Sequence, residues 1–132
     1  MSELFDIIDC VELYVSDLDE GIKYYRDLLG LKLLWRADTS VGLGMKNEVS
    51  EIVLQTDRKE MNVDFKVNSI DEAVNRIIKS GGTILNGPFD IPIGKCAVVR
   101  DQWNNKYVIL DMSKGKYITD ENKKVIGVEK AK

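Results

Sequence analysis

The sequence predicts an α+β fold made of two tandem βαβββ modules, and three observations support that prediction. The chain has 132 residues, of which 44% are hydrophobic, which is enough for one core but too little for two ordinary domains. In each half, a segment with the two-residue period of a strand leads into a segment with the signature of a capped helix. Residues 52 positions apart, such as Leu13 and Phe65, belong to the same class, so the two halves are repeats.

The first module begins with a strand. Residues 10–15 alternate polar and apolar side chains, which predicts a strand whose apolar face packs on a helix. Asp17 is followed three residues later by Glu20, a pattern typical of a helix N-cap, and the helix is expected over 21–29. Gly30 is the expected C-cap. Three further strands are predicted near 31–36, 41–46 and 51–56.

The second module repeats this order. Residues 62–67 are expected to form a strand, and Ser69 with Glu72 has the pattern of a capping box. An amphipathic helix is predicted over 72–80, and the pair of glycines that begins at Gly81 is expected to end it. Three more strands are predicted near 83–86, 95–100 and 106–111.

These elements predict one domain over residues 1–112, with module one at about 8–56 and module two at about 61–112. Residues 113–132 lie outside the repeat and carry six lysines. They are expected to form either an accessory hairpin or a frayed arm, and the pattern favours the hairpin.

Composition excludes several classes of function. The net charge of −3 offers no broad basic surface, which argues against nucleic acid as a partner. No apolar run approaches the roughly 20 residues that a membrane span needs. The N-terminus has no basic region followed by an apolar one, so we expect a cytoplasmic protein without a membrane partner.

The chain contains no histidine, and this excludes catalytic triads, zinc sites and proton shuttles that are built on imidazole. Cys10 and Cys96 are far apart and form neither a disulfide framework nor a CxxC motif. We expect both to be buried thiols.

The strand-to-helix joints carry a resemblance to a known family. Residues 13–33 read LYVSDLDEGIKYYRDLLGLKL, and residues 67–73 of the second module read VNSIDEA. Over about 8–112 the sequence resembles the glyoxalase, bleomycin-resistance and extradiol-dioxygenase superfamily, which has the vicinal oxygen chelate fold. The resemblance implies two half-barrel sheets, each curved around a cavity, with the helices on the outside.

A turn late in the chain adds to the resemblance. Residues 101–107 read DQWNNKY. This stretch is similar to the family's Asp-Pro-x-Gly-Asn turn, with Gln102 in place of the proline and Asn104 in place of the glycine.

In metal-dependent members of this family, four ligands line the cavity. The resemblance maps these positions to Cys10, Val53, Asn62 and Val108, and Gln55 replaces Val53 if the fourth strand shifts by two residues. Valine has no lone pair to donate, and a thiol with an asparagine amide is too weak a set to hold a divalent ion. We therefore expect no metal and no cofactor.

Strand parity predicts the face turned away from the helices. This face carries Cys10, Glu12 and Tyr14 in the first strand and Asn62, Asp64 and Lys66 in its repeat partner. Glu12 and Asp64 admit three interpretations. They keep a wet cavity polar or pair with Lys66; they accept hydrogen bonds from a cationic or hydroxyl-rich ligand; or their repulsion raises the pKa of one, which then acts as a catalytic base.

Two tryptophans also have alternative interpretations. Trp35 and Trp103 lie near predicted strand ends, where an indole either packs in the core or rim, or forms a wall that stacks against a planar ligand. Similarity to bleomycin-resistance proteins favours such a wall at Trp35. Tyr14 is a second candidate for this role.

The leading hypothesis is a metal-independent small-molecule binding protein of the bleomycin-resistance type, which sequesters an antibiotic or a planar metabolite. The predicted ligand-binding residues are Cys10, Glu12, Tyr14, Trp35, Val53, Gln55, Asn62, Asp64, Lys66, Trp103 and Val108. The resemblance implies a homodimer. One alternative is a glyoxalase-like lyase or isomerase with a displaced site that includes Glu12, Asp64 and Gln55, and another is an interaction module that binds through 113–132.

Overall fold

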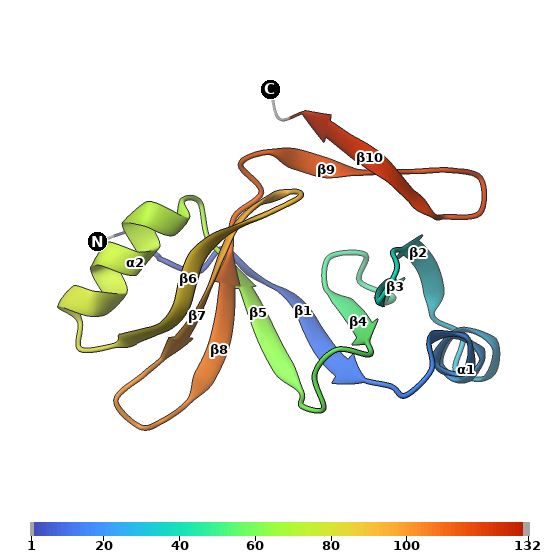
Figure 1. Ribbon diagram of the computed structural model, residues 1–132, viewed down its shortest axis with the longest axis horizontal. Coiled ribbons are helices and arrows are strands. Elements are labelled where there is room, and N and C mark those ends of the chain that lie inside the picture. The colour runs from blue at the N-terminus through green and yellow to red at the C-terminus, as the bar shows by residue number, and fades with distance from the viewer. Residues whose placement is uncertain (1, 131–132) are drawn as a thin grey trace. The chain divides into compact units, whose positions relative to one another are not determined.

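The computed structural model describes residues 2–130 and confirms the α+β class and the order of the elements (Figure 1). The first half contains β1 (Ile7–Tyr14), α1 (Leu18–Ile22), the π-helix η1 (Lys23–Leu28), β2 (Lys32–Arg36), β3 (Ser40–Gly44) and β4 (Glu51–Gln55). The second half contains β5 (Asn62–Lys66), α2 (Ile70–Lys79), β6 (Thr83–Ile91), β7 (Gly94–Arg100) and β8 (Lys106–Leu110). Strands β9 (Gly115–Thr119) and β10 (Val125–Lys130) follow. Within the described range, no helix is long and apolar enough to cross a membrane.

The chain folds as two compact units. The N-terminal unit consists of residues 9–62 and 117–127, and the C-terminal unit consists of the described residues among 1–8, 63–116 and 128–132. The tip of the last hairpin thus belongs to the N-terminal unit, although it lies far along the chain. Each unit is described below by itself.

In the N-terminal unit, the strands follow the order β2-β3-β4-β1, with β1 parallel to β4 and the other pairs antiparallel. One face of this sheet packs against α1. The buried core of the unit comprises Leu18, Ile22, Val41, Leu43 and Leu54, and Leu13 and Val15 of the first module pack against it. The predicted apolar face of the first strand is therefore confirmed at Leu13 and Val15.

The start of the first helix is capped as predicted. Asp17 is the N-cap, and its Oδ1 accepts a hydrogen bond from the N–H of Glu20 at 2.9 Å. The second half of the helix differs from the prediction, because it continues as the π-helix η1, where the N–H of Leu29 donates to the carbonyl of Tyr24 five residues back. Gly30 follows with φ of 84°, the left-handed conformation expected of a C-cap.

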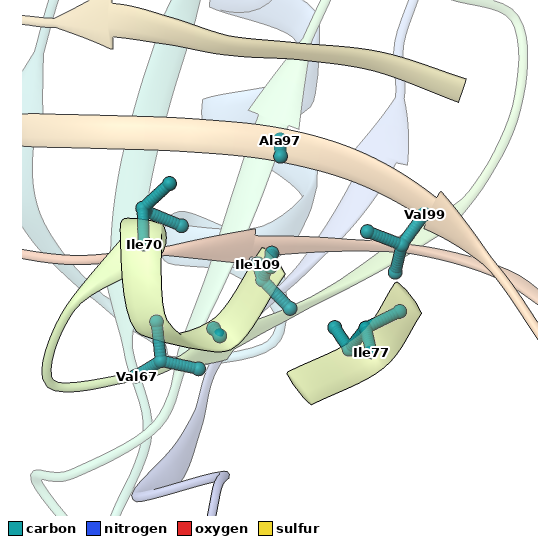
Figure 2. Close-up of a cluster of buried hydrophobic side chains, with 7 residues drawn as sticks. Val67, Ile70, Ile77, Ala97, Val99 and Ile109 are labelled. Atoms are coloured by element: carbon teal, nitrogen blue, oxygen red, sulfur yellow. The ribbon is translucent and has the colours of Figure 1, made fainter. Parts of the chain in front are cut away.

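In the C-terminal unit, the strands follow the order β5-β8-β7-β6, with β5 parallel to β8. Helix α2 lies against this sheet, and Ser69 caps it by accepting from the N–H of Glu72. Figure 2 shows the apolar cluster beneath the helix, where side chains of α2 meet those of β7 and β8. The buried members of this cluster are Val67, Ile70, Ala73, Ile77, Ala97, Val99 and Ile109.

A buried carboxylate fixes the junction between α2 and the β6–β7 turn. Asp111 is 3% exposed, and its Oδ2 accepts from the N–H of Ile70, the first residue of α2, at 3.0 Å. Its Oδ1 accepts from the N–H of Lys95 and from both the N–H and the hydroxyl of Ser113. A Cβ at Gly94 would lie 2.4 Å from this Oδ1, so only glycine fits there.

The C-terminal segment forms a hairpin, the alternative that the sequence favoured over a frayed arm. Strands β9 and β10 form a two-stranded sheet, and Asp120 closes their turn by accepting from the N–H groups of Asn122 and Lys124. At the end of β2, the N–H of Arg36 donates to the carbonyl of Lys123, in the turn of the hairpin, at 2.8 Å. The hairpin tip is thereby joined to the edge strand of the N-terminal unit.

We predict that Asp111→Ala lowers the free energy of unfolding by about 3 kcal/mol, because it leaves several buried N–H donors without their acceptor. Asp120→Ala is the matched control, since it removes a carboxylate that also accepts two backbone bonds but is only partly buried, and it should cost about 1 kcal/mol or less. Urea denaturation of both variants measures the difference. Equal losses would contradict the role assigned to Asp111.

The carboxylate of Asp111 should also make the free energy of unfolding depend on pH in the acid range. Burial disfavours the charged form of Asp111, but the N–H donors of Ile70, Lys95 and Ser113 together with the Ser113 hydroxyl outweigh it, so its pKa is lowered. Its contribution is therefore complete above the unfolded pKa of about 3.9, and it is lost as pH falls from there through the folded pKa. Asp111→Ala should lose less stability than the wild type over this range.

Candidate functional site

The face of the N-terminal sheet opposite α1 carries polar side chains. On β1 and β4, the residues that alternate with the core-facing Leu13 and Leu54 point to this face. They are Cys10, Glu12 and Tyr14 on β1, and Glu51, Val53 and Gln55 on β4. The register places Cys10 beside Glu51, Glu12 beside Val53 and Tyr14 beside Gln55. The structure thus brings five of the predicted ligand-binding residues onto one face and adds Glu51.

A bulge in β2 turns two consecutive side chains, those of Leu34 and Trp35, to this face. The register with β3 shifts between Leu33 and Trp35, and Leu33 packs in the helix-side core. Two glycines of β3 make room for the side chains that the bulge presents. A Cβ at Gly42 would lie 2.0 Å from the indole nitrogen of Trp35, and one at Gly44 would lie 3.2 Å from the Leu34 side chain.

Trp35 is held by a carboxyl group and by the hairpin. Its indole Nε1–H donates to Oε1 of Glu51 at 2.9 Å. Its ring centroid lies 5.1 Å from that of Tyr117, with the planes tilted by 45°. Trp35 is partly buried, so the core or rim interpretation and the ligand wall interpretation both remain compatible with its position.

The surroundings of Glu51 disfavour the charged form of its carboxyl group. Burial raises its pKa, the hydrogen bond from Trp35 opposes the rise, and the nearby charge of Asp9 adds to it, with a net upward shift. Burial also raises the pKa of the Tyr117 hydroxyl, and the charges of Glu51 and Asp9 contribute. A carboxyl group with a raised pKa in a recess is a candidate functional group.

That recess is a pocket of about 230 Å³. Its lining comes from β2, from the end of β3, and from the loop and first residue that lead into β4: Lys32, Leu34, Gly44, Met45, Glu48, Val49, Ser50 and Glu51. A second pocket, of about 540 Å³, shares Lys32, Gly44, Met45 and Glu48 with it. The polar face therefore opens to solvent beside Glu51.

Glu12 and Gln55 are engaged by the loop that follows β4. Glu12 is 6% exposed and forms an ion pair with the guanidinium of Arg58. The side-chain oxygen of Gln55 accepts from the N–H groups of Asp57 and Arg58, and its amide nitrogen donates to the carbonyl of Arg58. Gln55 thus shapes the loop that delivers Arg58 to Glu12.

The equivalent face of the second module is more apolar. Asn62 and Asp64 of β5 are buried, and the register places Asp64 beside Val108 of β8. Val108 belongs to an apolar cluster with Cys96 and Leu110. Lys66 at the end of β5 forms an ion pair with Asp6, with 3.5 Å between Nζ and Oδ2. Both cysteines of the chain are buried thiols, as expected.

Trp103 lies elsewhere, in the loop between β7 and β8, where it is 76% exposed and cannot be a core residue. Asp101 organises the turn around it. Asp101 accepts from the N–H groups of Trp103 and Asn105 and from the Asn105 side chain. Asn104, which stands in place of the motif's glycine, has φ of 68°, a conformation that glycine and asparagine favour.

The four mapped metal positions do not form a donor set. Val53 and Val108 present only methyl groups, and no group of three cysteine or acidic side chains within residues 2–130 is placed to hold a metal ion. The residues present do not fit the metal that the resemblance implies.

Sequence reasoning missed three residues of this face. Glu51 shares the parity of Val53 and Gln55, so the period-two pattern contains the signal for it. Arg58 and Tyr117 belong to a loop and to the hairpin, and no pattern in the sequence links them to β1 or β2.

Comparisons with known proteins agree with this architecture. Residues 7–109 match the family model described as the Glyoxalase/Bleomycin resistance protein/Dioxygenase superfamily. No curated protein matches the sequence. Methylmalonyl-CoA epimerase from Mycobacterium tuberculosis superposes with a TM-score of 0.71 at 16% identity, over 84% of this chain and 91% of that one.

Two further solved structures share the fold. One is described as an NAD-dependent benzaldehyde dehydrogenase from Legionella pneumophila, with a TM-score of 0.65, 21% identity and coverage of 78% of this chain and 97% of that one. The other is homoprotocatechuate 2,3-dioxygenase from Brevibacterium fuscum, with a TM-score of 0.61, 22% identity and coverage of 83% and 38%. At these identities the likeness shows a common fold, on which different functions occur.

The partly buried carboxyl group of Glu51 leads to a prediction about stability. Because its pKa is raised in the folded state, its favourable contribution is present below the unfolded value of about 4.3 and is lost as pH rises through the folded pKa. Glu51→Gln keeps an acceptor for Trp35 without the charge. We therefore expect this variant to have a higher melting temperature than the wild type at pH 7, with the difference shrinking toward pH 4.

Glu48→Gln is the matched control, because Glu48 lines the same pocket but its side chain is 79% exposed. Its melting temperature should follow that of the wild type at every pH. A Glu51→Gln protein that is less stable than the wild type at pH 7 would contradict the unfavourable burial of this carboxylate.

Proposed function

Because the chain belongs to the glyoxalase/bleomycin resistance protein/dioxygenase superfamily, we propose that it is a small-molecule binding protein whose site needs no metal ion. The observation that carries this proposal is the pocket on the polar face of the N-terminal sheet, which has apolar walls and the carboxyl group of Glu51, to which the Trp35 indole donates a hydrogen bond. Pockets of this composition, mostly apolar with a few placed polar groups, are typical of ligand sites.

The substitutions at the mapped metal positions support binding without metal chemistry. Val53 lies beside Glu12, and the ion pair with Arg58 already compensates the charge of Glu12. Gln55, the substitute ligand suggested by the sequence, uses its oxygen to accept two backbone hydrogen bonds. A ligand that enters this face would meet Trp35 of β2 as an aromatic wall, with Val53 on β4 and Cys10 and Tyr14 on β1 farther across the same face.

A planar aromatic metabolite or antibiotic is the ligand class that this wall favours, because aromatic rings stack on an indole and bury large areas with few rotatable bonds. Sequestration of such a compound requires affinity and no chemical step. A homodimer and a cytoplasmic location stay predictions from the sequence.

A second candidate, a lyase or isomerase, is favoured by one observation. Glu12 and Asp64 are buried carboxylates at equivalent positions of the two modules. Asp64→Asn tests this candidate. If the wild type converts a bound compound and the variant does not, Asp64 acts in catalysis rather than in recognition.

The proposed function predicts a ligand-dependent thermal shift. A planar compound that binds the folded chain should raise the melting temperature with concentration, since a hundredfold excess over its dissociation constant adds about 2.7 kcal/mol to the free energy of unfolding. The same compound should change the emission of Trp35. Trp103→Phe should retain this change, whereas Trp35→Phe should lose it.

Metal analysis of the purified protein completes the test. We expect dialysis against EDTA to leave ligand binding unaltered. One equivalent of tightly bound nickel, zinc or iron per chain, or a panel of planar compounds and antibiotics that never shifts the melting temperature, would contradict the proposal.

A further inference from the structure

We propose that the pocket beside Glu51 selects ligands that carry a positive charge on an apolar body, such as an arylalkylammonium compound. This inference rests on the proposed function and assigns the chemical class of its ligand. It follows from the charges that line the pocket, from the surroundings of Glu51, and from the two aromatic rings beside it.

The pocket has apolar walls and one partly buried charged group. Leu34, Met45 and Val49 supply the apolar lining, and Ser50 adds a hydroxyl. Glu51 lies at the start of β4 and is partly buried. A pocket of about 230 Å³ has room for a single ring with a short substituent.

The two other charged residues of the lining compensate each other. Nζ of Lys32 lies 3.9 Å from Oε1 of Glu48, and their side chains are 77% and 79% exposed. Exposed pairs of this kind are screened by water and contribute little to the local potential. The charge that a ligand meets inside the pocket is therefore that of Glu51.

The surroundings of Glu51 add negative rather than positive potential. Asp9 acts on Glu51 as a like charge, and burial disfavours the carboxylate further. Trp35 donates one hydrogen bond to Oε1, and a carboxylate has a second oxygen that can accept from a ligand. An ammonium group would relieve both the desolvation and the repulsion, whereas an anionic ligand would increase them.

The aromatic rings favour the same charge. The ring centroids of Trp35 and Tyr117 lie 5.1 Å apart, and the indole Nε1–H of Trp35 donates to Glu51, so both rings lie behind the carboxyl group that lines the pocket. The negative face of an indole or phenol ring attracts a cation that lies within about 6 Å of its centroid. Carboxyl group and rings together match a cation attached to an apolar body better than a neutral or an anionic compound.

Three probes of nearly equal size separate these cases: benzylammonium, benzyl alcohol and benzoate. Each is titrated into ¹⁵N-labelled protein that carries Trp103→Phe, so that the Trp35 indole N–H gives the one tryptophan side-chain signal. This N–H group donates to Glu51, which lines the pocket, so its signal reports on the pocket. We expect benzylammonium to bind at least about fivefold more tightly than benzyl alcohol, and benzoate not to bind measurably.

Two glutamine variants locate the selectivity. Glu51→Gln should weaken the binding of benzylammonium by about fivefold or more, equivalent to about 1 kcal/mol, and should leave benzyl alcohol unaffected. Glu48→Gln removes the same formal charge from the same pocket, and we expect a loss of less than about twofold because Lys32 and solvent already offset that charge.

The outcomes distinguish this inference from the proposed function. Equal binding of benzyl alcohol and benzylammonium, or an affinity for benzylammonium that survives Glu51→Gln, overturns the preference for cations and leaves small-molecule binding in place. Tighter binding of benzoate than of benzylammonium would likewise overturn the preference for cations. If no probe moves the indole signal, the inference is wrong for this pocket, and the thermal-shift panel decides the proposed function on its own.

Discussion

The packing of one helix against one face of a four-stranded sheet is the constraint on which each unit of this protein depends. In the N-terminal unit this contact buries Leu18 and Ile22 of α1 against Val41, Leu43 and Leu54, and burial of such side chains is the main source of stability in a domain of this size. Because the period of a strand is two residues, the same packing sends every alternate side chain to the opposite face. That face does not pack against the helix and can therefore carry polar side chains. Glu12, Glu51 and Gln55 lie on it.

The three polar side chains on that face are stabilised to different extents. Gln55 is satisfied by the backbone of the loop that follows β4, and Glu12 by the guanidinium of Arg58. Glu51 has a hydrogen bond from Trp35, yet burial and the charge of Asp9 still raise its pKa. A group that opposes stability while it lines a pocket is more informative about function than one that is fully paired, since stability and function often compete at the same residue. This contrast distinguishes Glu12, whose charge is paired, from Glu51, the candidate functional carboxyl group.

Local patterns in the sequence predict the parts of the fold that local interactions determine. The N-caps at Asp17 and Ser69 form as expected, and Asn104, which stands in place of the motif's glycine, takes a left-handed conformation. The π-helix after α1 and the bulge at Leu34 leave no mark in the periodicity of the sequence, which therefore did not predict them. Glu51 was predictable from parity alone. The contact between Trp35 and Tyr117 was not, because it joins segments far apart in the sequence.

Tyr117 connects a segment outside the matched family region to the candidate site. The match to the superfamily ends at residue 109, so the hairpin of β9 and β10 lies outside the shared fold. Yet Tyr117 packs on Trp35, and Lys123 pairs through its backbone with Arg36 of the same edge strand. The shared fold thus supplies the pocket and its carboxyl group, and an added segment supplies the second aromatic ring. Changes in the hairpin can therefore alter the surroundings of Trp35 without disturbing the packing of α1 on its sheet, and segments added to a shared fold in this way are one route to different functions.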